Sequence, residues 1–184
     1  MHQHTIARES TALVVIDLQE AFRQAIPDFG EVVANVARMA RGAQILGVPV
    51  LVTEQYPRGL GHTAEEIRLA LPDEQEIIEK TAFSSCGAAA FNERLQALRV
   101  KHVIVCGIEA HICVNQTVHD LLAQGYAAHL LRDCISARFD HNKQAGLDKM
   151  RQSGALPSSI EMALFEMMRD ARHEQFKAIQ KLVK

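Results

Sequence analysis

Residues 101–124, KHVIVCGIEAHICVNQTVHDLLAQ, contain the pattern that decides the fold. The segment opens with an apolar, β-branched run at 101–107 and continues as a stretch at 113–124 whose apolar residues recur at helical spacing. A strand that is apolar on both faces is typical of a parallel sheet with helices on both sides. The segment therefore predicts one β-α unit of a larger α/β domain.

The same alternation repeats on both sides of this unit. Further strands are predicted at 11–18, 48–53, 76–79 and 127–132, with a short last strand at 158–163. Further helices are predicted at 31–46, 89–98, 141–152, 161–168 and 172–184. Alternating strands and helices form right-handed β-α-β units. We therefore expect one domain, residues 1–184, built as a three-layer αβα sandwich.

Composition narrows the classes of function. Lys and Arg number 20 against 22 Asp and Glu, a net charge of −2, so no basic excess exists to neutralise a nucleic acid. No apolar run approaches the ~20 residues of a membrane span. Four cysteines are too few for a disulfide scaffold, and the first residues lack the apolar stretch of a secretory signal. We expect a cytoplasmic protein with free thiols and a small-molecule substrate, without nucleic-acid or membrane partners.

Three chemically active side chains occur at predicted strand ends. In parallel sheets, ligands bind beyond the carboxyl ends of the strands, near the point where strand order reverses. Asp17 interrupts the first apolar run, Lys80 follows the third, and Cys113 lies between the fourth strand and its helix. A buried carboxylate there could act as a general base, and a thiol as a nucleophile.

Each of the three also has a structural interpretation. Asp17 could cap a neighbouring loop, and Lys80 could be a solvated surface lysine. Cys113 could be a small buried apolar residue, as most free cysteines are. In the functional interpretation, Cys113 faces the N-terminus of the next helix, whose dipole and free N–H groups lower the pKa of a thiol. Cys106, inside the fourth strand, is predicted to be core packing.

Motifs for other chemistries are absent from the sequence. No GxGxxG follows the first strand, no phosphate-binding P-loop occurs, and no GxSxG marks a serine hydrolase. The cysteines and histidines lack the close spacing of a metal site. These observations predict an enzyme without a cofactor or a metal.

Three segments together resemble one family. They are VIDLQ at 15–19, KTAFS at 80–84 and GIEAHICV at 107–114. In this order they are similar to the isochorismatase-like cysteine hydrolase superfamily, over nearly the whole chain. Within it, EQYP at 54–57, MRQSG at 150–154 and FKAIQKL at 176–182 resemble the isochorismatase domain-containing proteins.

The resemblance implies a six-stranded parallel sheet of order 3-2-1-4-5-6 and a role for each candidate. Cys113 would be the nucleophile, Asp17 would take and return its proton, and Lys80 would stabilise the thiolate and orient Asp17. A cis peptide bond would precede Glu109. The backbone N–H groups of Glu109 and Cys113 would then form an oxyanion hole.

The resemblance also implies a pocket and a distinction from two relatives. The pocket is expected to have walls from Gln19, Phe22, Tyr56, Phe83 and His111. Nicotinamidases bind a metal through an Asp-x-His pattern after the second strand, where this chain reads EQY at 54–56. Isochorismatases proper lack the nucleophilic cysteine. We therefore expect neither a metal nor enol-ether cleavage.

Three functions are compatible with these residues. The leading one is a metal-independent amidase that cleaves a small-molecule C–N bond through a Cys113 thioester. The alternatives are a non-catalytic or redox-sensing oligomeric module, with Cys113 as a peroxide-sensitive thiol, and a nicotinamidase-like enzyme. The segment EMALFEMM at 161–168 is apolar nearly all round, which is typical of a buried or interfacial helix. It predicts a homo-oligomer.

Overall fold

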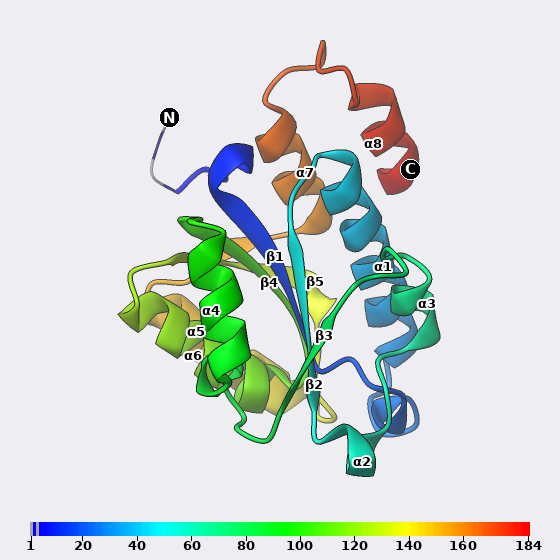
Figure 1. Cartoon of the computed structure of the whole chain (residues 1–184), viewed down its shortest axis with the longest axis vertical. Helices are drawn as coiled ribbons and strands as arrows, with labels where there is room; N and C mark the ends of the chain where they lie inside the picture. Colours follow the sequence, from blue (N-terminus) through cyan, green and yellow to red (C-terminus); the bar gives the residue numbers. More distant parts are fainter. Residues whose placement is uncertain (1, 3) are drawn as a thin grey trace.

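A single parallel sheet organises the chain in the computed structural model, which describes residue 2 and residues 4–184. The six strands are hydrogen-bonded in the order β3-β2-β1-β4-β5-β6, as expected (Figure 1). Their bounds are β1 Thr11–Ile16, β2 Val50–Gln55, β3 Ile77–Lys80, β4 His102–Gly107, β5 Ala127–Ile135 and β6 Leu156–Ser158.

Helices cover both faces of this sheet. Their bounds are α1 Phe29–Ile45, α2 Pro57–Leu60, α3 Glu65–Arg68, α4 Ala89–Ala97, α5 Asn115–Ala123, α6 Asp140–Gln152, α7 Ile160–Met168 and α8 Phe176–Val183. α1, α3, α7 and α8 pack on one face, and α4, α5 and α6 on the other (Figure 1). None of the helices formed by the described residues has the length and apolarity needed to cross a bilayer.

The central strand β1 explains why the sheet is buried on both sides. All six of its residues are buried. Successive side chains of a strand point to opposite faces, so Leu13 and Val15 enter the α1 core while Val14 and Ile16 enter the α5 core. In register, Ile16 lies beside Thr53 of β2 and Gly107 of β4. The carboxyl ends of the three central strands therefore meet at one edge.

The last strand and its helix differ from the sequence prediction. The strand predicted at 158–163 is β6 at Leu156–Ser158, and helix α7 begins at Ile160. The reason is a helix cap, because the Ser159 side chain accepts a hydrogen bond from the Met162 N–H at 3.3 Å.

Two other boundaries matter for the site. β5 extends to Ile135 rather than 132, so Asp133 and Cys134 lie inside the strand instead of following it. The helix predicted to start at Cys113 begins at Asn115, because a turn of π-helix at Ala110–Val114 comes first. Cys113 is therefore held inside that turn.

Candidate active site

Asp17 leaves β1 through a sharp turn at the carboxyl edge of the sheet. Its φ is 54°, in the left-handed region that aspartate tolerates better than most residues. The Asp17 N–H donates to the Thr53 carbonyl at 3.1 Å, and its Oδ1 accepts from the Thr53 hydroxyl at 2.7 Å. Asp17 is 1% exposed, so this carboxylate is buried and needs a charged partner.

Lys80 is that partner. From the end of β3 it reaches across β2, and its Nζ donates to Asp17 Oδ2 at 2.6 Å. The same ammonium donates to Gln55 Oε1 at 2.8 Å and to the Phe83 carbonyl at 2.9 Å. Both charged side chains are buried. Lys80 is therefore not a solvated surface lysine, because every proton of its ammonium has an acceptor within the protein.

The turn that carries Cys113 is held by close backbone contacts. The Ala110 N–H donates to the Ser136 carbonyl at 2.8 Å. Helix α6 approaches the turn at Gly146, where a Cβ atom would lie 2.7 Å from the Ala110 carbonyl oxygen. Only glycine permits this approach. The packing leaves Cys113 7% exposed and fixes it in the α5 core.

The acidity of the Cys113 thiol is opposite to the sequence prediction. Burial, followed by the negative charge of Asp17, raises the pKa of Cys113 to about 12, although Lys80 opposes this effect. The sequence argument considered only the start of the next helix and not the burial of the thiol, which is the largest effect on its pKa. At neutral pH the resting thiol therefore keeps its proton, and the carboxyl group of Asp17 is near enough to act on its pKa.

Acidity does not distinguish Cys113 from the other cysteines, whose pKa values are raised too. Burial raises the pKa of Cys86 to about 11, and it raises the pKa values of Cys106 and Cys134 well above the ordinary range. Cys106 is fully buried, as predicted for a core residue. What distinguishes Cys113 is its position beside Asp17 and Lys80, both of which act on its pKa.

Glu109 lies between β4 and the π turn. The Ile108–Glu109 peptide bond is cis, as the resemblance implies. The Glu109 carboxylate is buried and accepts from the Arg138 N–H at 2.9 Å and from Arg138 Nε at 3.0 Å. Within the described residues, the N–H groups of Glu109 and Cys113 make no hydrogen bond outside their own turn.

Gln19 has a different position from the pocket wall that we expected. It is fully buried. Its Nε2 donates to the carbonyls of Gln55 and Gly61 at 3.0 and 2.7 Å, and its Oε1 accepts from the Gln55 N–H at 2.7 Å. The amide is occupied by backbone on both sides. Gln19 therefore fixes the loop after β2 and has no free group for a ligand.

The other expected pocket residues are spread around the carboxyl edge. Tyr56 and Phe83 are 55% and 54% exposed, whereas Phe22 packs against the α1 core. His111 is half-buried in the π turn, and its Nδ1 is buried without a hydrogen-bond partner in the described structure. Tyr56 also lines a cavity of about 540 Å³ together with Lys80, Arg58, Ala82 and residues at the start of α4. Their roles as pocket walls stay predictions.

Three residues of this site were not identified from the sequence. Thr53 binds Asp17, and Gln55 binds Lys80 while its Nε2 donates to the Thr81 carbonyl at 2.8 Å. Ser85 lies 3.5 Å from the Thr53 hydroxyl and donates its N–H to Thr117 Oγ1 at 2.8 Å. A polar residue at the end of a buried strand is a signal that could have identified Thr53.

Glu54, near the end of β2, has a structural role. Glu54 is buried, and its Oε1 accepts from the Thr63 N–H at 2.6 Å and the Thr63 hydroxyl at 2.7 Å. Its Oε2 lies 3.2 Å from His62 Nδ1. Among the described residues, no group of three or more His, Cys, Asp or Glu side chains is placed to hold a metal ion. Glu54 closes the loop at 54–63 onto the sheet.

The parallel sheet with an acid–lysine pair beside a cysteine defines an isochorismatase-like hydrolase. The isochorismatase domain matches residues 11–162, and the chain belongs to the isochorismatase family. Isochorismatase domain-containing protein 2 of Macaca fascicularis is 41% identical, over 95% of this chain and 83% of that protein. Isochorismatase domain-containing protein 1 of Salmo salar is 37% identical over 95% of this chain, which spans 61% of that longer protein.

Solved structures agree with this assignment. A Caenorhabditis elegans protein described as MAR1 ribonuclease has a TM-score of 0.93 and 37% identity, over 97% of this chain and 92% of that one. Escherichia coli YcaC, described as an octameric hydrolase of unknown specificity, has a TM-score of 0.89 at 18% identity, over 97% and 88% of the two chains. The second likeness concerns the fold alone.

Proposed function

We propose that this protein is a metal-independent cysteine hydrolase that cleaves the C–N bond of a small amide through a Cys113 thioester. The observation that carries the proposal is the buried ion pair of Asp17 and Lys80, whose charges both act on the Cys113 thiol. A buried ion pair is costly to form and is weak evidence for stability. At the ligand-binding edge of a parallel sheet, it supports a catalytic role.

In the first step, the thiol proton of Cys113 passes to Asp17 as the sulfur attacks the amide carbonyl carbon. The carbonyl electron pair moves to oxygen, and the oxyanion accepts hydrogen bonds from the N–H groups of Glu109 and Cys113. Loss of one such donor costs ~3 kcal/mol of transition-state stabilisation. The Lys80 ammonium keeps positive charge beside the forming thiolate and holds Asp17 in place.

In the second step, the tetrahedral intermediate collapses and the C–N bond breaks. Asp17 returns its proton to the leaving nitrogen, so that an amine departs and an acyl thioester remains on Cys113. A water molecule then attacks the thioester carbonyl while Asp17 takes a proton from it. Cleavage of the C–S bond releases a carboxylic acid, and the sulfur regains its proton from Asp17.

The decisive experiment is to trap the thioester. The protein is mixed with small amides, ureides and carbamates, quenched in acid and examined by mass spectrometry for an acyl adduct on Cys113. Cys113→Ala is expected to abolish both adduct and turnover, and Asp17→Asn is expected to abolish turnover while the fold is retained. Hydrolysis by a folded Cys113→Ala variant would refute the mechanism.

The same screen separates the alternative functions. Nicotinamide as the preferred substrate would favour the nicotinamidase-like reading. Cys113 oxidised by peroxide without any amide turnover would favour the redox-sensing module. RNA is included among the test substrates because the C. elegans relative is described as a ribonuclease. The presence of Asp17 and Lys80 beside Cys113 favours hydrolysis over redox sensing, since a sensor thiol needs no proton carrier.

Independence from metal has its own test. Extended dialysis against EDTA is expected to leave amide hydrolysis unchanged. Glu54 is the best candidate metal ligand at this strand end, and its carboxylate already contacts Thr63 and His62. Activity is measured before and after dialysis, and again after addition of Zn²⁺. Loss of activity that Zn²⁺ restores would contradict the prediction and favour the nicotinamidase-like alternative.

We also propose that the protein forms a homo-oligomer. Helix α7 buries five residues, yet Met162 and Phe165 remain 51% and 37% exposed. The Phe165 ring contacts Phe176 of α8 edge to face, with centroids 6.1 Å apart. Exposed apolar side chains on neighbouring helices are typical of a subunit interface. Light scattering is expected to show an assembly that the Met162→Asp/Phe165→Asp variant dissociates, and a wild-type monomer at micromolar concentration would contradict this.

A further inference from the structure

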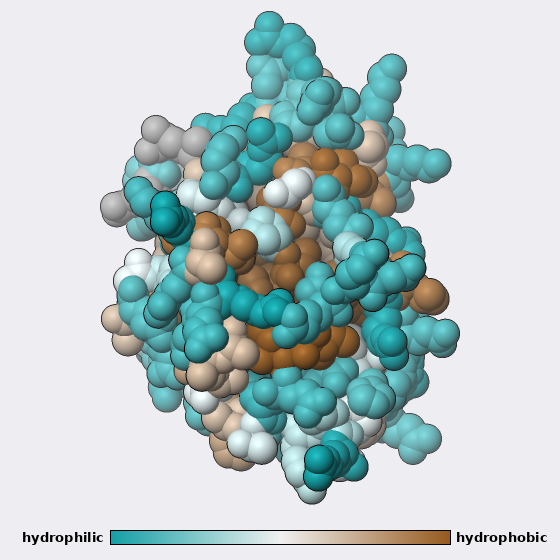
Figure 2. All heavy atoms as spheres, in the orientation of Figure 1, coloured by the Kyte–Doolittle hydropathy of each residue, from teal (hydrophilic) through white to brown (hydrophobic). Residues whose placement is uncertain are grey.

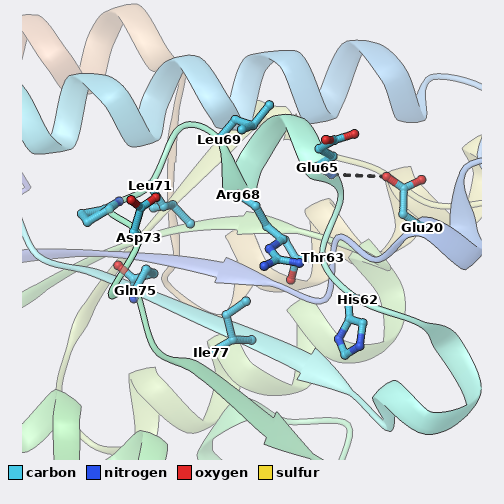
Figure 3. A pocket seen from close by; sticks show the side chains of 11 residues that line it. Glu20, His62, Thr63, Glu65, Arg68, Leu69, Leu71, Asp73, Gln75 and Ile77 are labelled. Atoms are coloured by element: carbon cyan, nitrogen blue, oxygen red, sulfur yellow. Dashed lines mark hydrogen bonds between the residues drawn. The ribbon is translucent and has the colours of Figure 1, made fainter.

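A cavity of about 620 Å³ lies beside the edge strand β3, under the loop that contains α3 (Figure 3). It is on the other face of the sheet from the catalytic pair. Thr53 points toward Asp17, and Glu54, the next residue of β2, points to the opposite face and binds Thr63, a wall residue of the cavity. This volume is in the range of small-molecule sites.

Arg68 is the only positively charged side chain among the described residues that line this cavity, if His62 is neutral. Arg68 is exposed and lines the cavity, and in Figure 3 its guanidinium lies next to Thr63, on the side of the cavity that Ile77 also lines. Among the residues that the structure describes, the Arg68 side chain makes neither an ion pair nor a hydrogen bond, whereas Arg23 nearby bonds to Glu20 and Glu66. A planar guanidinium with free donors matches the two oxygens of a carboxylate.

The walls combine apolar surface with side chains that are already fixed. Leu71 is 8% exposed, and Ile77 packs against the α1 core. Apolar atoms are visible in the middle of the molecular face where β3 lies (Figure 2). Gln75 Nε2 donates to the carbonyls of Val50 and Glu76 at 3.2 and 3.0 Å, and Thr63 is held by Glu54. A ligand would therefore find preformed walls, which lowers the entropic cost of binding.

The charges around Arg68 restrict the ligand further. Glu20 lines the cavity but is paired with Arg23 at 2.7 Å. Glu65 and Asp73 also line it, and neither has an ion-pair partner in the described structure. These two carboxylates repel any anion, and a dianion more than a monoanion, so the attraction for a carboxylate comes from Arg68 alone. A compact single charge with a hydrocarbon body fits the cavity better than a dianion does.

We propose that this cavity is a second binding site, distinct from the catalytic one, for a small monocarboxylate. Its carboxylate pairs with the Arg68 guanidinium, and its hydrocarbon part lies on Ile77 and Leu71. Because the proposal concerns binding alone, it does not rest on the proposed hydrolysis.

The test is a titration of the full chain with butyrate and benzoate, followed by ligand-observed saturation-transfer NMR. Butyramide and benzamide serve as neutral probes of the same shape. Arg68→Gln is expected to weaken carboxylate binding by ~10-fold or more, and Arg68→Lys by less, since it keeps the charge but loses the fork. The matched control is Arg41→Gln, an exposed arginine on α1.

The Cys113→Ala variant is titrated in parallel and is expected to bind butyrate as the wild type does, so failure of the hydrolase proposal leaves this result unaffected. Four outcomes overturn the second site. They are no saturable carboxylate binding, equal binding of butyrate and butyramide, tighter binding of inorganic phosphate than of butyrate, and an Arg68→Gln variant that binds as well as Arg41→Gln.

Discussion

At the scale of single residues, the buried pair of Asp17 and Lys80 carries the proposed chemistry and contributes to the cost of folding. Four acceptors surround the ammonium, namely Asp17 Oδ2, Gln55 Oε1 and the carbonyls of Ala82 and Phe83. Both side chains are removed from water, so each charge depends on the other.

Removal of one partner should therefore be costly. Lys80→Met is expected to lower the free energy of unfolding by ~3–5 kcal/mol, because Asp17 would remain buried and unpaired. The double variant Asp17→Asn/Lys80→Met should recover part of this loss. Urea denaturation measures both. The control is Arg172→Met, which removes an exposed pair with Asp170 and should change stability little. Equal losses of stability in Lys80→Met and Arg172→Met would contradict the argument.

The raised pKa of Cys113 gives a second residue-scale prediction. Because the resting thiol is protonated, its rate of alkylation by iodoacetamide should rise about tenfold per pH unit from pH 6 to 9, without a plateau. Mass mapping separates Cys113 from the half-buried Cys86, and Cys113→Ser is the control. A plateau below pH 8 would show that the thiolate is the resting form.

At the scale of elements, helix α6 holds Cys113 in place by its contact with the π turn. Gly146 allows the helix to touch the backbone of Ala110 and His111. The turn is also joined to the loop after β5 through Ala110 and Ser136. The geometry of Cys113 thus depends on segments that follow it in the chain.

Gly146→Ala tests this contact. The new Cβ would lie 2.7 Å from the Ala110 oxygen and 2.9 Å from the His111 nitrogen, so the turn must move. We expect a loss of ~1–3 kcal/mol in stability and a larger loss of Cys113 acylation. Gly30→Ala in α1 is the matched control, because nothing lies within 4 Å of its added Cβ. Unchanged acylation in Gly146→Ala would show that the contact does not position Cys113.

At the scale of the whole molecule, a buried histidine pair affects stability against acid. His102 Nδ1 and His129 Nε2 lie 3.0 Å apart between β4 and β5. Burial, then the charge of His102, lowers the pKa of His129 to about 4, and burial also lowers the pKa of His102. The unfolded chain takes up these protons near pH 6.5, whereas the folded chain resists them. Stability is therefore full above pH 6.5 and lost as the pH falls toward 4.

His129→Gln should flatten this pH dependence. The titration of His129 accounts for a loss on the order of 3 kcal/mol between pH 6.5 and 4, which the variant removes. Urea unfolding at several pH values in this interval measures the difference between wild type and variant. His141→Gln, an exposed histidine, should retain the wild-type slope. Identical slopes in all three proteins would contradict the assignment.

Local pattern in the sequence was sufficient to predict most of the fold. Apolar runs and helical spacing located the strands and helices, because burial of one face leaves a periodic trace in the chain. Family resemblance, rather than periodicity, supplied the strand order. Asp17, Lys80 and Cys113 were found because polar residues at the ends of apolar strands meet at one edge of a parallel sheet.

What these residues do to one another depends on distance through space. Lys80 and Asp17 are separated by 63 positions, and Thr53 and Asp17 by 36, yet they are hydrogen-bonded. The low pKa expected for Cys113 from the helix dipole was wrong, because burial and then the charge of Asp17 raise the pKa of this thiol. Burial and neighbouring charges set a pKa, and both arise only when distant segments pack. The acidity of Cys113, the use of Gln19 as a loop anchor and the cavity around Arg68 are therefore properties of the tertiary structure.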